Sequence, residues 1–162
     1  MKIKVSAGII GAVLMLSSSQ SWAVTLKLSH NQDKSNPVHK AMYFFEKNSK
    51  AYSNGDITIR IYPNGTLGTQ RETMELIRSG AIPLVKTNAA EMEAFENSYK
   101  LFSLPYLFRD RDHYYQVMQG DIGRKILDST KSKGYFGLSV YDGGARSFYG
   151  NKQVLTPDDL KG

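Results

Sequence analysis

Cysteine is absent from the 162 residues, which excludes disulfide bonds and metal sites with cysteine ligands. The three histidines, His30, His39 and His113, lie in separate segments without the spacing of a metal site. We expect each of them at the surface or in a loop, and we expect no metal and no cofactor. The sequence also lacks a P-loop, a dinucleotide fingerprint, a nucleophile elbow and an HExxH pattern. No catalytic residue is therefore predicted, and the protein is not expected to be an enzyme.

Long apolar runs are missing as well, except near the N-terminus. Lys2 and Lys4 precede an apolar run from Val5 to Leu16, and Ser21-Trp22-Ala23 places small residues where a signal peptidase reads. The alternative is a membrane anchor, but the run is well short of the ~20 residues that span hydrocarbon. Residues 1–23 are thus predicted to be a signal peptide, cleaved after Ala23, which would send the product to the periplasm.

The formal net charge of the chain is positive but small. Removing Lys2 and Lys4 with the signal peptide lowers the formal net charge from +6 to +4. The remaining lysines and arginines are scattered rather than gathered in a basic stripe, so nucleic acid is not an expected partner. A small positive balance of this kind favours acidic small molecules.

Strand and helix patterns alternate along the chain, which predicts an α/β lobe with a largely parallel sheet flanked by helices. Alternating apolar residues predict strands over 24–29, 56–62, 82–87, 135–141 and 145–149. Helical spacing and capping residues predict helices over 37–54, 69–80 and 110–133, the last with a break at Gly120. Short helical pieces are predicted over 91–95 and 97–102. We expect residues 103–108 to be a buried apolar segment. The helix residues expected to face inward are Val38, Ala41, Met42, Phe45, Tyr52, Met74, Ile77, Ala81, Tyr115, Met118, Ile122 and Ile126.

Polar side chains recur near the carboxyl ends of the predicted strands, where parallel α/β sheets place their ligands. For any one of these residues a solvated loop position is the simpler interpretation, but their recurrence at one edge makes them candidates for ligand binding. The candidates are His30-Asn31, Gln70-Arg71, Lys86, Asn88 and Arg146.

Five motifs, in order along the chain, resemble the DctP-type solute receptors of tripartite ATP-independent periplasmic (TRAP) transporters. They are the turn Ile61–Gly68 (IYPNGTLG), the helix exit Glu75–Ile82, the segment Phe102–Asp110 (FSLPYLFRD), the strand Gly144–Tyr149 and the turn Thr156–Gly162 (TPDDLKG). Pro83 departs from the family pattern, which usually has an aspartate there. The resemblance covers essentially all of the chain from Val24 to Gly162.

The resemblance implies a two-lobed receptor that closes on a small organic acid by a hinge motion and delivers it to membrane-embedded transporter subunits. Residues 24–142 correspond to the first lobe, and residues 143–162 to a crossover strand and the truncated start of the second. By motif position, Arg146 corresponds to an arginine on the anionic side of the ligand, and Asn31, Gln70 and Asn88 to pocket-lining positions.

The family's main carboxylate-binding arginine follows the "LKG" turn, and the chain ends before it. We therefore expect the chain by itself not to bind its ligand tightly. Two other interpretations stay open: a truncated, non-functional product of such a receptor, and an exported hydrolase lobe, which the missing nucleophile–base pattern disfavours.

Overall fold

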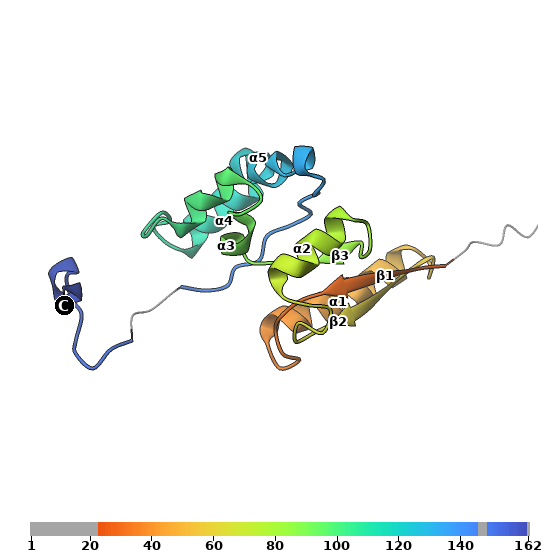
Figure 1. Ribbon diagram of the computed structural model, residues 1–162, viewed down its shortest axis with the longest axis horizontal. Helices are drawn as coiled ribbons and strands as arrows, with labels where there is room; N and C mark the ends of the chain where they lie inside the picture. The colour runs from red at the N-terminus through yellow and green to blue at the C-terminus, as the bar shows by residue number, and fades with distance from the viewer. Residues whose placement is uncertain (1–22, 146–148, 162) are drawn as a thin grey trace, which may run out of the picture.

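The sheet at the N-terminal end of the chain is parallel, as predicted. A computed structural model describes residues 23–145 and 149–161. In it, β1 (Val24–Ser29) lies between β2 (Ile57–Tyr62) and β3 (Leu84–Val85), in the order β2-β1-β3. Both pairings are parallel, so the carboxyl ends of all three strands meet at one edge of the sheet (Figure 1).

Helix α1 (Pro37–Tyr52) begins as the sequence predicts. The Asn36 side chain accepts a hydrogen bond from the Val38 N–H at 2.9 Å, and Pro37 occupies the first helical position. Met42 is buried against Leu28 and Ile59 of the sheet, and these three residues form the first hydrophobic core. Tyr52, predicted to face inward, is exposed, because the helix ends there beyond the edge of this core.

Helix α2 (Gln70–Arg78) begins with the predicted capping box. The Thr69 hydroxyl accepts from the Glu72 N–H at 3.3 Å, and the Glu72 carboxylate accepts from the Thr69 N–H at 2.8 Å. Ala81, predicted to continue the inward face, is exposed because the helix ends at Arg78 and the chain turns at Gly80.

The second half of the chain is mainly helical. Its elements are α3 (Ala89–Met92), η1 (Asn97–Ser103), α4 (Arg111–Gln119), α5 (Asp121–Ser129), η2 (Lys131–Lys133) and η3 (Pro157–Leu160). The predicted break at Gly120 separates α4 from α5. Ile122, predicted to face inward, is exposed, since this break starts α5 with a new orientation and buries Ile126 and Leu127 instead.

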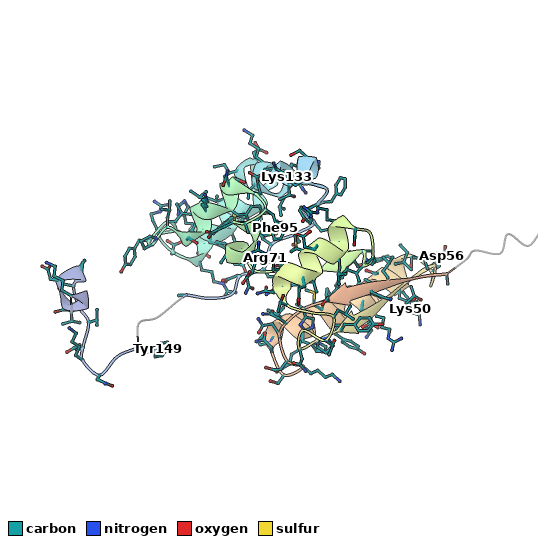
Figure 2. The ribbon with its side chains drawn as sticks, in the orientation of Figure 1. Lys50, Asp56, Arg71, Phe95, Lys133 and Tyr149 are labelled. Atoms are coloured by element: carbon teal, nitrogen blue, oxygen red, sulfur yellow. The ribbon has the colours of Figure 1, made fainter. Side chains whose placement is uncertain are left out.

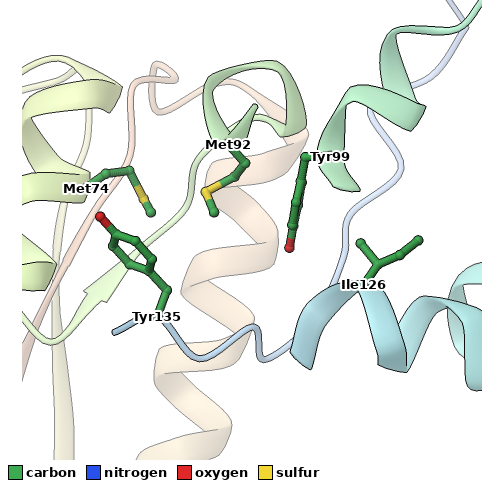
Figure 3. Packing of buried hydrophobic residues seen from close by; sticks show 5 residues of the cluster. All are labelled: Met74, Met92, Tyr99, Ile126 and Tyr135. Carbon is green, nitrogen blue, oxygen red and sulfur yellow. The ribbon is translucent and has the colours of Figure 1, made fainter. Parts of the chain in front are cut away.

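A second hydrophobic core joins α2 to this helical part. Figure 3 shows Met74 of α2, Met92 of α3, Tyr99 of η1, Ile126 of α5 and Tyr135 arranged around one interior. Phe95 packs edge-on to the Tyr135 ring at a centroid distance of 5.6 Å. These residues come from five separate segments, so this core holds α2 against the helical part of the chain.

Residues 103–108 are not the buried segment that was predicted. Leu104 is exposed, and Tyr106 is 90% exposed with a left-handed φ of 57°. Pro105 prevents a continued helix, so the chain turns outward between η1 and α4. Only Leu107 and Phe108 are partly buried, and the Phe108 ring packs edge-on to Tyr114.

Two predicted strands are shorter than expected or absent. The strand predicted over 82–87 contains only the two residues of β3, because Pro83 has no N–H and the Ile82 N–H donates to the Leu76 carbonyl at the end of α2. Residues 135–141 form no strand. They pack on α5, where the Arg124 guanidinium donates to the Gly137 carbonyl at 2.8 Å. Three residues of the strand predicted over 145–149, at positions 146–148, lie outside the described residues.

Candidate functional site

The carboxyl ends of the strands are held together by backbone hydrogen bonds that extend past the sheet. The Lys86 N–H donates to the Ser29 carbonyl at 2.8 Å, and the His30 N–H donates to the Tyr62 carbonyl at 3.0 Å. The His30 carbonyl in turn accepts from the Gly65 N–H at 3.0 Å. The three loops that leave the sheet therefore start from one fixed edge.

Three of the predicted site residues form a hydrogen-bonded network at this edge. The Gln70 side-chain carbonyl accepts from the Asn88 N–H at 2.8 Å, which ties the first residue of α2 to the segment after β3. The Lys86 ammonium donates to the Asn88 side-chain carbonyl at 2.6 Å. We call Gln70, Lys86 and Asn88 the edge network. It combines a cation with two amide groups, and each amide carries both donors and acceptors.

The other predicted residues are not part of the edge network. Asn31 is exposed, and its side-chain carbonyl accepts from the Gln32 side-chain amide at 3.2 Å. Arg71 is also exposed and lies at the N-terminal end of α2 (Figure 2). Asn31 shares the strand edge through its neighbour His30, whereas Arg146 lies outside the described residues.

Lys86 is partly buried, although it carries a charge in its ordinary state. Burial lowers the pKa of its ammonium group, because removing water disfavours the charged form. Its hydrogen bond to Asn88 goes to a neutral amide oxygen. A cation held in this way has unused capacity to attract an anion, which distinguishes it from a solvated surface lysine.

His30 lies in the loop after β1, as expected of a surface or loop histidine, but its side chain is buried. It follows β1 directly and is only 2% exposed. Its Nε2 lies 3.0 Å from Nδ1 of His39 in α1, and its Nδ1 accepts from the Gln32 N–H at 3.1 Å. Burial lowers the pKa of His30, and the nearby charges of His39 and Lys86 lower it further. The sequence signal for this pair is the position of His39 in the first turn of the helix that follows β1, where it faces back toward the strand end.

A separate open groove of about 410 Å³ lies between α1 and β2. It contains none of the residues predicted for the site. Its lining residues are Lys34, His39, Tyr43, Glu46, Ile59, Arg60, Ile61 and Pro63. The groove therefore opens on the β2 side of the sheet, whereas the edge network spans β3 and α2.

Residues 23–145 and 149–161 contain neither a cluster of metal ligands nor a membrane-spanning helix. No group of three or more histidine or carboxylate side chains in these ranges could hold a metal ion. The same part of the chain contains no helix with the length and apolar character needed to cross a membrane.

Comparison with known proteins identifies a family that covers most of the chain. The family described as bacterial extracellular solute-binding protein, family 7 (DctP) matches residues 28–162. The chain is 36% identical over 139 residues to the Salmonella typhimurium protein YiiZ, covering 85% of this chain and 42% of that protein. It is 29% identical to the C4-dicarboxylate-binding periplasmic protein DctP of Rhodobacter capsulatus, covering 86% of this chain and 42% of that protein.

Solved structures give the same result for the fold. A TRAP periplasmic solute-binding protein of Xanthobacter autotrophicus with bound β-D-galacturonate has a TM-score of 0.77 and 34% identity, covering 85% of this chain and 46% of the other. One from Anaerococcus prevotii with bound D-glucuronate has a TM-score of 0.77 and 33% identity, with 86% and 46% covered. The chain thus spans about half the length of the proteins it matches.

Proposed function

Because the chain belongs to family 7 of the bacterial extracellular solute-binding proteins, we propose that it forms the first lobe of a periplasmic receptor for a small organic acid. The family consists of solute receptors, and we infer the same role here in place of an enzymatic one. In this proposal residues 24–142 form the lobe, and residues 143–162 lead toward a second lobe. The receptor would deliver its ligand to the membrane-embedded subunits of a TRAP transporter.

The edge network is the observation that supports this proposal. Lys86 provides a partly desolvated cation for a carboxylate, and its attraction for an anion is stronger there than in bulk water. Gln70 and Asn88 hold each other through one hydrogen bond, which leaves the Gln70 amide nitrogen and the Asn88 amide nitrogen as donors for a ligand. Asn31, Arg71 and, outside the described residues, Arg146 are proposed as further contacts.

Within the organic acids, we propose a sugar acid of the uronate class. A uronate carries one carboxylate and several hydroxyls, which suits one cation beside two amides, since amides both donate to and accept from hydroxyl groups. The structures with bound galacturonate and glucuronate are 34% and 33% identical to the chain. The structure from Sulfurospirillum deleyianum with bound succinate is 28% identical and covers 71% of the chain. A C4-dicarboxylate has few or no hydroxyls for the two amides, and it is the second candidate because the Rhodobacter relative is a C4-dicarboxylate-binding protein.

Calorimetry on the complete receptor tests the ligand class. The panel consists of D-glucuronate, D-galacturonate, succinate, L-malate and uncharged D-glucose. We expect uronates to bind at least tenfold more tightly than dicarboxylates and D-glucose not to bind. Tight binding of D-glucose, or of none of the panel by a folded receptor, would contradict the proposal.

A pair of lysine variants tests the role of the edge network. Lys86→Met removes the cation and keeps the length of the side chain, whereas Lys47→Met makes the same change on the exposed surface of α1. We expect Lys86→Met to weaken uronate binding by about 2–4 kcal/mol, the scale for a charge-assisted contact. Lys47→Met should leave the affinity unchanged. Equal effects of the two variants would show that only the net charge matters and would refute the assignment of Lys86.

A further inference from the structure

His30 is fixed at the strand edge more firmly than its loop position suggests. Its side chain is buried, and both of its backbone groups are bonded, the N–H to Tyr62 and the carbonyl to Gly65. Asn31, a candidate ligand contact, is the next residue. The N–H of Gln32, one residue further, donates to the His30 ring at 3.1 Å. The ring therefore closes a short loop around Asn31.

The hydrogen bonds determine where the ring protons lie. A backbone N–H can only donate, so Nδ1 of His30 must carry a lone pair. A neutral His30 ring then has its proton on Nε2, which donates to Nδ1 of His39 at 3.0 Å. Nδ1 of His39 is thus an acceptor, and the neutral His39 ring has its proton on Nε2. The direction of donation runs from Gln32 to His30 and from His30 to His39.

An additional proton on either ring is incompatible with one of the two hydrogen bonds, Gln32 to His30 or His30 to His39. A proton on Nδ1 of His39 would face the Nε2–H of His30, and a proton on Nδ1 of His30 would face the Gln32 N–H. Both arrangements set two donors against each other, so one hydrogen bond must be lost.

The charged groups around the pair are mixed in sign. On the side of His30, Lys86 after β3 opposes protonation. On the side of His39, the groove is lined by the cationic Lys34 of the loop and Arg60 of β2 and by the anionic Glu46 of α1. Tyr43 of α1 is the other titratable group that lines this groove.

We propose that His30 and His39 are positioning residues for the candidate ligand edge, which hold Asn31 in place only while both rings are neutral. Acidification would then release the loop around Asn31 and weaken ligand binding. This second consequence rests on the proposed function, but the release of the loop does not. Burial lowers the pKa of His30, which is consistent with a ring that stays neutral near pH 7.

Nitrogen-15 NMR of the 162-residue chain tests the proposal without any ligand. Long-range proton–nitrogen spectra of the rings should show the Nε2–H form for both His30 and His39 at neutral pH. On acidification through the range in which histidine side chains titrate, about pH 7.5 to 5, the backbone amide signal of Asn31 should shift together with the ring signals of the pair. An Nδ1–H form of His39, or an Asn31 amide that does not follow the rings, would overturn the proposal.

Two matched variants separate this pair from a general effect of acid. His39→Asn places an amide oxygen close to the position of Nδ1 and does not titrate, so the Asn31 amide should then follow the His30 ring alone. His113→Asn changes a histidine of α4 whose Nδ1 also accepts a backbone N–H, that of Arg109 at 3.2 Å, and the transition should persist. An Asn31 amide transition that is the same in His39→Asn as in the unchanged chain would show that His39 has no such role.

Calorimetry with D-glucuronate on the complete receptor adds the functional consequence. Affinity should fall about three- to tenfold on acidification, as expected for one net hydrogen bond, and in His39→Asn the fall should follow the His30 ring alone. Constant affinity in the wild-type receptor would refute the link to binding. If D-glucuronate does not bind at any pH while the NMR results hold, the proposed ligand class is wrong and the positioning of the loop stands.

Discussion

Gln70→Glu places a negative charge in the edge network while keeping its geometry. Glutamate has the shape of glutamine, and its carboxylate can accept the same hydrogen bond from the Asn88 N–H, now 2.8 Å long. The lobe should therefore fold as before. If an anionic ligand binds at this edge, it must now approach a like charge.

The size of the effect follows from the separation of the charges. At an effective dielectric constant of about 20, two like charges ~5 Å apart repel by about 3 kcal/mol. Lys86 donates to the neighbouring Asn88, and its charge offsets part of this repulsion. We expect a net loss of about 1.5–3 kcal/mol, or about 10- to 150-fold in affinity.

Calorimetry with D-glucuronate at low and physiological ionic strength measures this loss. Gln116→Glu, which adds the same charge on the exposed surface of α4, is the matched control and should leave the affinity within about twofold. The melting temperature verifies that both variants are folded. Unchanged affinity in a folded Gln70→Glu receptor would mean that the anion does not bind at the edge network.

Four further predictions concern the fold, the pH response, the crossover segment and export. Met74→Ala should lower the free energy of unfolding by about 2–5 kcal/mol in urea titrations, because the side chain of this α2 residue is buried in the second core. The free energy of unfolding should also fall as the pH drops below about 6.5, since the lowered pKa of His30 lets the unfolded chain bind the proton first; urea titrations at several pH values measure this slope. Arg146→Ala should weaken uronate binding by about 2–4 kcal/mol in calorimetry, as expected for loss of a charged contact to the ligand. Mass spectrometry of periplasmic material should find a mature N-terminus at Val24, and an intact leader in the membrane fraction would contradict cleavage after Ala23.

Local signals predicted the N-terminal part of the fold well. The cap at Asn36 and the capping box at Thr69 depend only on residues within one turn, so α1 and α2 begin where the sequence indicates. The strand predicted over residues 135–141 is wrong because a strand depends on contacts outside the segment. Alternation predicts that a strand is possible, but a strand also needs a neighbour, and here Arg124 and α5 occupy the segment.

The candidate site was predicted in its position but not in its connections. The carboxyl ends of parallel strands must meet, and this rule alone brought Gln70, Lys86 and Asn88 to one edge. It could not predict which of these side chains bond each other, because those bonds depend on the short length of β3. The burial of His30 was missed, since it depends on where α1 packs, and a residue next to a polar loop carries no sign of that packing.

The burial of Lys86 supports the proposal that this edge binds a ligand, because the lysine does not stabilise the lobe. Its burial disfavours the charged state, and the Asn88 amide oxygen it contacts is neutral and cannot fully replace the lost water. A methionine of similar length would avoid this cost, so a lysine here weakens the empty lobe. An anionic ligand supplies the missing countercharge in the bound state. In the complete receptor, Lys86→Met should therefore raise the melting temperature without ligand and reduce the increase that a uronate adds. A purely structural lysine would not give this combination of opposite effects.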